Sequence, residues 1–386
     1  MAAGRDADEA FRTGDYDRAI ALGRVGRTAD SVRCFDRALA GRVASLDALR
    51  GLAVLFMLEV HLGSWWAREL PAENALVSLG TMLGGMAAPI FLVLSGAGLS
   101  LSRSREPGLF VRRSAARGAA LLLAGVAFTF AEQAVYGPFG WGVLQCIGLS
   151  IILCAPLMGL PRCARELLGI GLLGCAMFAR WLLGVPEVLH ADQLKSVGSA
   201  ADYLRNMLVS GFFPLLPWTG FMLLGTGVGD RLVAPAGRSG RPDIAGFSLP
   251  VLLVLGGAVL AAGGLRPEFF PPSLSFALLA CGICLLAIPA LGAAGLGRAG
   301  PLADLGRISL TVFIVHHFAG YEAFRAAGAM SSFELPATLG MVLVSWALAL
   351  LAARAWGRAG FRWSLERALS RLGRPPPNKL NTRPAD

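Results

Sequence analysis

Ionisable side chains follow one another along a single apolar stretch of the chain, residues 42–66. This stretch is long enough to cross a membrane, and it contains Asp47, Arg50, Glu59 and His61. Each of them is costly in lipid unless it faces protein, water or a ligand. At about 100° per residue, Arg50 lies within about 20° of His61 on a helix, and Asp47 within about 40°. Glu59 falls on the opposite face. An anchor helix needs no such stripe, so we expect this helix to form the core of an active site.

The chemistry of this stripe differs between its two ends. His61 can take a proton from a hydroxyl or an amine, which is the work of a general base in acyl transfer. Its alternative role is to anchor a helix end at the membrane interface. Arg50 can bind phosphate through its planar fork, held in place by Asp47, or the two can form a purely structural ion pair. About 16 Å of helix separates Arg50 from His61.

A second polar helix is expected at residues 302–324, where two adjacent histidines lie in an apolar run. Its direction places His316 in the same half of the membrane as His61, whereas His317 points about 100° away. His316 is therefore a second candidate base, although both histidines could instead be satisfied by backbone carbonyls. No third ligand with zinc-like geometry is evident, so we expect no metal. Two further polar residues, Gln145 and Arg307, are candidates for binding the donor beside Arg50 and Asp47.

The composition predicts an all-α, polytopic membrane protein. Of 386 residues, 55% are hydrophobic and only 16% are charged, which is too little charge for the surface of a soluble domain of this size. We predict ten spans in residues 42–360, between an N-terminal tail (1–41, possibly part of a helical repeat) and a basic C-terminal tail (361–386). The predicted spans are 46–66, 74–102, 115–133, 138–160, 166–184, 210–229, 246–264, 273–292, 305–326 and 335–356.

The positive charges predict the orientation of these spans. Of the 35 Lys and Arg residues, 28 fall in segments on one side and five in segments on the other. The positive-inside rule then places both termini in the cytoplasm of a multi-pass inner-membrane protein. This distribution, in short stretches between apolar runs, also argues against nucleic acid as a partner. The seven cysteines include Cys281 and Cys284, which we interpret as one helix face and not as a redox or metal site.

Five stretches in this order resemble a known family: RVASLDALRGLAVLFMLEVH (42–61), AAPIFLVLSG (87–96), GVLQCIGL (142–149), FPLLPWTGFMLLG (213–225) and LGRISLTVFIVHH (305–317). They are similar to bacterial membrane proteins related to heparan-α-glucosaminide N-acetyltransferase, within the wider transmembrane acyltransferase superfamily. The resemblance covers residues 42–356. It implies an enzyme that takes acetyl groups from cytoplasmic acetyl-CoA and passes them to a sugar amine or hydroxyl on the far side. It also implies that Asp47 and Arg50 lie near the donor, and that His61 matches the essential histidine of the more distant acyltransferase-three branch of this superfamily. The lysosomal member has its proposed catalytic histidine further along, and the corresponding stretch here contains no histidine after His61.

Several alternatives remain open from the sequence. Direct transfer and a relay through an acetyl-histidine are both compatible with it, and either His61 or His316 could be the base. A transporter or flippase for a glycan or lipid-linked substrate would use the stripe as a path, although no repeat between the two halves supports this. A non-catalytic scaffold is a third reading, and a homodimer is a further possible assembly.

Overall fold

The structure is a computed structural model that describes residues 44–105, 107–132, 135, 137, 139–185, 197–233, 244–293 and 300–372. Its helices are α4 (Ala44–Trp66), α5 (Ala75–Gly85), α6 (Ala87–Arg105), α7 (Phe110–Ala131), α9 (Val143–Leu157), α10 (Arg162–Leu182), α12 (Ala200–Arg205), α13 (Leu215–Val233), α14 (Ile244–Ala262), α15 (Leu274–Ala293), α16 (Pro301–Arg307), α17 (Ser309–His316), α18 (Ala323–Ala326), α19 (Leu335–Arg358) and α20 (Leu365–Arg371), with π-helical turns η1 (Asn206–Ser210) and η2 (His317–Glu322). An isolated bridge between Ala67 and Phe333 is the one β-type pairing in these ranges. The all-α fold is confirmed. The predicted tail at 1–41 lies outside the described residues.

Helices occupy all ten of the predicted spans, but fewer than ten are long and apolar enough to cross a membrane on their own. Among the residues that the structure describes, four stretches meet that test, namely 75–105 (α5 with α6), 110–131 (α7), 274–291 (in α15) and 335–358 (α19), and the number rises to six if each of two bent helix pairs is one span. Neither α4 nor α10 meets it, and both contain several charged residues. The count of ten and the placement of the termini therefore stay predictions.

Two of the predicted spans are bent. The range 305–326, expected as one straight helix, breaks at Ile308, where α16 and α17 meet at 77°. The break is stabilised from outside, because the Glu366 carboxylate accepts hydrogen bonds from the backbone N–H groups of Leu310 and Thr311 at 2.6 and 3.1 Å. Backbone N–H groups in the first turn of a helix have no partner within that helix, so the carboxylate of Glu366 stabilises the N-terminus of α17. At the sixth span, the helical stretch 200–210 (α12 with η1) meets α13 at 42° across residues 211–214. Within α13, Leu216 is non-helical just before Pro217.

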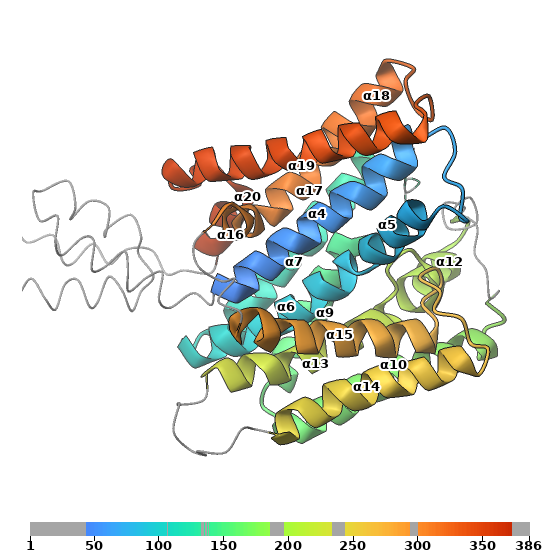
Figure 1. Ribbon diagram of the computed structural model, residues 1–386. Coiled ribbons are helices and arrows are strands. Elements are labelled where there is room, and N and C mark those ends of the chain that lie inside the picture. Colours follow the sequence, from blue (N-terminus) through green and yellow to red (C-terminus); the bar gives the residue numbers. More distant parts are fainter. Residues whose placement is uncertain are drawn as a thin grey trace, which may run out of the picture.

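Helix α4 lies in the middle of the bundle and contacts α5, α6, α15, α16, α17 and α19 (Figure 1). Its contact with α16 is unusually close. A Cβ atom added to Gly51 would lie 1.9 Å from the carbonyl oxygen of Leu302, and one added to Gly306 would lie 1.9 Å from that of Asp47. Glycine at both positions therefore lets the two backbones touch, and it brings the start of α4 against the end of α16.

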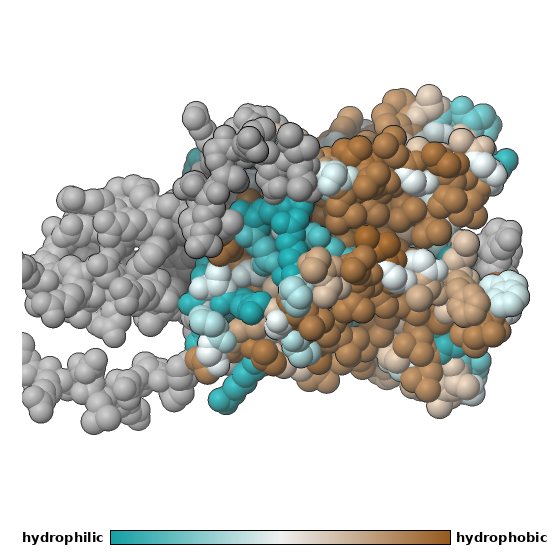
Figure 2. Space-filling model, turned by 90° about the horizontal axis from the view of Figure 1, so that it is seen from below, coloured by the Kyte–Doolittle hydropathy of each residue, from teal (hydrophilic) through white to brown (hydrophobic). Residues whose placement is uncertain are grey.

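Hydropathy divides the surface in a way that fits a membrane protein. In Figure 2 hydrophobic residues cover most of the visible face, and hydrophilic residues gather toward the end at which α4 begins in Figure 1. Many large apolar side chains are exposed on the helices, among them Leu123 of α7, Val259 of α14 and Leu351 of α19. Contiguous exposed apolar surface of this kind is rare on soluble monomers.

Candidate active site

Two histidines from distant parts of the chain meet at the far end of α4. His61 Nδ1 lies 2.9 Å from His316 Nε2, and the two rings are nearly parallel. His61 comes from the last turns of α4 and His316 from the end of α17, and the contact between these helices holds the pair. The structure thus brings together the two candidate bases that the sequence predicted.

A further contact fixes the protons of the neutral pair. His316 Nδ1 is 3.2 Å from the carbonyl oxygen of Val312, which can only accept a hydrogen bond. His316 therefore carries its proton on Nδ1 and presents a lone pair at Nε2. His61 Nδ1–H must donate to that lone pair, which leaves the lone pair of His61 at Nε2. His61 is partly exposed and His316 is buried, so His61 is the better placed of the two to meet a substrate.

A third histidine, His317, completes a cluster that the sequence did not predict. The nitrogens of His61, His316 and His317 lie within 4.8 Å of one another. His317 begins the π-helical turn η2, and Glu132 Oε2 at the end of α7 lies 3.8 Å from its Nδ1. Both side chains are almost fully buried. The sequence predicts that His317 points about 100° away from His316, and this angle alone does not show that both rings can reach His61.

These three imidazoles are a group that could hold a metal ion. The His61–His316 contact argues against that use, because two nitrogens bound to one tetrahedral zinc lie roughly 3.3 Å apart and must both offer lone pairs. Here they are 2.9 Å apart, and one donates to the other. The expectation that no metal is used therefore stays a prediction.

Aromatic rings enclose the cluster. The indole of Trp65 stacks on the His61 ring at 5.3 Å and on the His316 ring at 5.6 Å between centroids. Phe128 packs edge-on against His317 at 4.7 Å. Trp65 lies four residues after His61, which puts the two on one face of α4. That spacing is the signal that could have placed Trp65 in the site.

An ion-pair network lies at the other end of α4. Asp47 accepts from Arg50 at 2.7 Å and from Arg307 at 3.5 Å. Arg307 also binds Asp304 at 3.2 Å, and Asp304 in turn binds Arg354 of α19 at 2.9 Å. Asp47 is buried, whereas the Arg50 side chain keeps 28% of its surface exposed. The structure thus joins three of the predicted donor-binding residues and leaves Arg50 able to reach a ligand.

Gln145 does not belong to this network. Its side-chain oxygen accepts from Gly142 N at 3.0 Å, and its amide nitrogen donates to Thr129 Oγ1 and to Gly140 O. Gln145 is buried and caps the start of α9 against α7, so its polar atoms are committed to the fold. We therefore leave Gln145 out of the donor site proposed below.

Comparison with known families gives two matches that together cover the bundle. Residues 42–261 match the family described as heparan-alpha-glucosaminide N-acetyltransferase, catalytic, and residues 267–362 match a protein family of unknown function (DUF418). Asp47, Arg50 and His61 lie in the first range and Arg307 and His316 in the second, so the candidate site is formed where the two regions pack. No curated protein matched the chain. Because the first match spans more than half of the 386 residues, the chain belongs to the heparan-alpha-glucosaminide N-acetyltransferase catalytic family, a family of membrane acetyltransferases.

Proposed function

We propose that this protein transfers an acetyl group from acetyl-CoA, bound at the cytoplasmic end of α4, to a sugar amine or hydroxyl near the outer end. The observation that carries the proposal is the hydrogen-bonded chain from His61 through His316 to the Val312 carbonyl. It orients one imidazole with its free lone pair at Nε2, as a general base requires. The family match supports the reaction class.

In the proposed step, His61 Nε2 takes the proton from the acceptor N–H or O–H. The acceptor nitrogen or oxygen then forms a bond to the acetyl carbonyl carbon, and the bond from that carbon to the CoA sulfur breaks. The thiolate leaves with the electron pair and takes the proton from the His61 imidazolium, which restores the neutral base and gives CoA with a free thiol. His316 acts as a positioning residue, because its Nε2 accepts from His61 Nδ1 and stabilises the imidazolium that forms. A relay through acetylated His61 uses the same atoms in two steps.

The donor is expected at the opposite end of α4. Arg50 and Arg307 would contact its phosphates, and Asp47 is a positioning residue that holds both guanidinium groups. Arg50 and His61 are eleven residues apart, which is about 16 Å of helix and comparable with the reach of a pantetheine arm. We further propose that both termini are cytoplasmic and that the protein resides in the inner membrane, as the distribution of basic residues indicates.

Vesicles containing the purified full chain test this function. Acetyl-CoA labelled in its acetyl group is supplied on one side, with glucosamine or a mixed glycan extract on the other. Labelled acetylated product on the acceptor side is the expected result, together with a higher melting temperature of the protein in the presence of CoA. If CoA does not stabilise the protein and the protein does not consume acetyl-CoA, it is not an acetyltransferase. That result would favour the alternative function, a transporter or flippase.

Replacing Arg50 with Gln is expected to weaken donor binding. Loss of one charge-assisted hydrogen bond costs about 1.5–3 kcal/mol, so the KM for acetyl-CoA should rise roughly 10- to 100-fold with a much smaller change in kcat. Arg307 still pairs with Asp47 in this variant, so the fold should survive. Steady-state kinetics against acetyl-CoA measure the effect. Arg68→Gln is the matched control, because Arg68 is an exposed arginine beyond the other end of α4 that pairs with Glu334; an equal rise in both variants would remove Arg50 from the donor site.

A further inference from the structure

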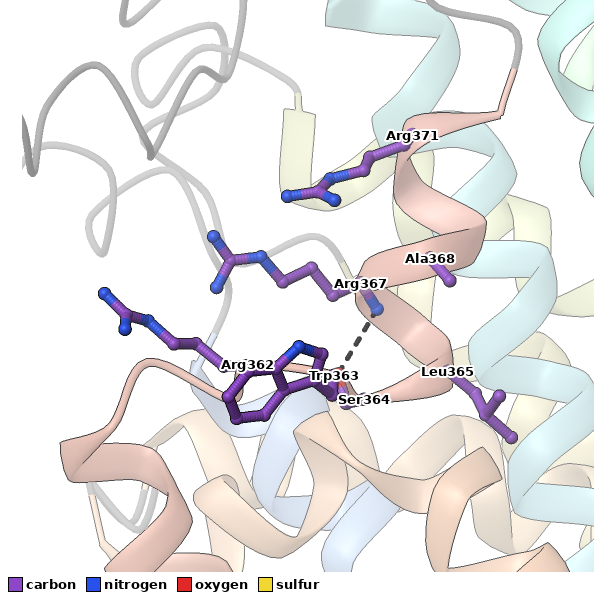
Figure 3. Close-up of a pocket in the computed structure, with 7 residues that line it drawn as sticks. All are labelled: Arg362, Trp363, Ser364, Leu365, Arg367, Ala368 and Arg371. Atoms are coloured by element: carbon purple, nitrogen blue, oxygen red, sulfur yellow. Dashed lines mark hydrogen bonds between the residues drawn. The ribbon is translucent and has the colours of Figure 1, made fainter.

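A hollow of about 540 Å³ lies beside α20, in the segment after the last predicted span. Three arginines and one tryptophan carry most of its chemistry: Arg362, Trp363, Arg367 and Arg371. Their guanidinium groups and the indole project to the same side of α20 in Figure 3. The predicted basic tail therefore begins with an ordered, concave surface of one charge sign.

The backbone holds this surface in an unusual conformation. Trp363 has φ of 64° and Phe361 has φ of 52°, a region that bulky residues rarely adopt. Contacts on both sides hold the turn, because Trp356 Nε1 donates to Arg362 O at 2.7 Å and Ser364 Oγ caps α20. The result is an indole that is 89% exposed. Strain of this kind tends to persist where a side chain must be presented to a ligand.

The same segment is joined to the ion-pair network of the candidate site. Glu366 of α20 binds the first turn of α17, and Phe361 lies 5.9 Å from the guanidinium carbon of Arg307. Arg307 in turn binds Asp47. The hollow is thus part of the same end of the bundle at which the proposed function requires the donor.

We propose that this hollow binds the adenine and the 3′-phosphate of the CoA donor and leaves the pyrophosphate to Arg50 and Arg307, an inference that rests on the proposed function. Guanidinium groups bind phosphate oxygens through paired hydrogen bonds, and an exposed indole offers a face on which adenine can stack. The volume falls within the range of about 300–1,000 Å³ that small-molecule sites occupy. With the adenine and the 3′-phosphate held here, the pyrophosphate lies at Arg50 and Arg307, and the acyl arm runs from there along α4 toward His61.

Phosphate in a lipid headgroup offers the same chemistry, since arginines and tryptophan on a short helix also suit a membrane surface. Two variants test whether the hollow binds the phosphate of CoA or that of a lipid headgroup. One is Trp363→Ala and the other is the double variant Arg362→Gln, Arg371→Gln, each made in the full chain in nanodiscs of neutral lipid. The matched control is Arg358→Gln, an exposed arginine at the end of α19 that does not line the hollow. Calorimetry measures binding of CoA, dephospho-CoA and adenosine 3′,5′-bisphosphate, and flotation measures binding to vesicles rich in phosphatidylglycerol.

We expect CoA to bind the wild type and the control alike, and each hollow variant about tenfold or more weakly. Adenosine 3′,5′-bisphosphate should compete with CoA, and dephospho-CoA should lose part of its affinity in the wild type. If wild type and hollow variants bind CoA equally, the inference is overturned and the proposed function stands. Loss of vesicle binding alone would identify a lipid headgroup site and also overturn it. If the wild type does not bind CoA, the proposed function fails, and this inference fails with it.

Discussion

Replacing His61 with Ala is expected to lower the rate of acetyl transfer by about 100- to 10,000-fold, the usual contribution of a positioned general base. His61 is the partly exposed member of the pair, and its Nδ1–H is committed to His316 Nε2. The loss should fall on kcat, with the KM for acetyl-CoA little changed, because the donor-binding arginines lie at the other end of α4. The assay is transfer of labelled acetyl groups by the variant in vesicles.

Glu59→Gln is the matched control, because Glu59 is a polar residue on the same helix that lies against Gly80 of α5 on the opposite face. It should keep nearly the wild-type rate. His316→Ala removes the acceptor that orients His61, together with a ring on which Trp65 stacks, and leaves the His61 base in place. Its rate should therefore fall between those of Glu59→Gln and His61→Ala. A His61→Ala protein that melts like the wild type and still transfers acetyl groups at more than about a tenth of its rate would remove His61 from the chemistry.

The sequence was sufficient to predict the side chains that regular helix geometry controls. The stripe on α4 follows from about 100° per residue, and the structure pairs Asp47 with Arg50 as that periodicity predicts. Charge and hydropathy predicted the all-helical fold, and the direction of each helix predicted that His61 and His316 lie in the same half of the membrane. The contact between the two rings is known only from the structure. Each of these arguments needs only one helix at a time.

Side chains that depend on departures from regular geometry could not be predicted in this way. His317 joins the cluster at the point where the helix changes to a π-helical turn, and the break at Ile308 is held by Glu366, a residue more than fifty positions away. Glu132 reaches His317 only through the packing of α7 against the rest of the bundle. Gln145 shows the opposite case: its polarity suggested a ligand, but its amide proves to be used within the fold.

Whether a glycine is needed for close helix packing depends on the helix that lies against it. Gly96 and Gly98 lie two residues apart on α6. A Cβ added to Gly96 would lie 1.9 Å from the carbonyl oxygen of Met222, whereas one added to Gly98 would meet nothing within 4 Å. Composition cannot separate these two positions, because the difference lies entirely in the neighbouring helix.

Two glycines of α4, Gly51 and Gly63, differ in the same way as Gly96 and Gly98. Replacing Gly51 with Ala is expected to destabilise the folded protein. The added Cβ would meet the Leu302 carbonyl oxygen at 1.9 Å and its carbon at 2.9 Å, and neither backbone atom can turn aside as a side chain could. Helices α4 and α16 must separate, which costs about 1–3 kcal/mol or more. The ion pair between Asp47 and Arg307 spans this crossing, so donor binding should weaken as well.

Gly63→Ala is the control that isolates this cause, since it makes the same substitution in the same helix where nothing lies within 4 Å of the new atom. Replacing a helical glycine with Ala stabilises a helix by about 0.5–1 kcal/mol when the space is open. The two variants should therefore shift the melting temperature in opposite directions, with Gly51→Ala below the wild type and Gly63→Ala at or above it. Equal melting temperatures would mean that the crossing of α4 and α16 is looser than described here, and the alignment of the donor network with the histidine pair, which depends on that crossing, would lose its structural basis.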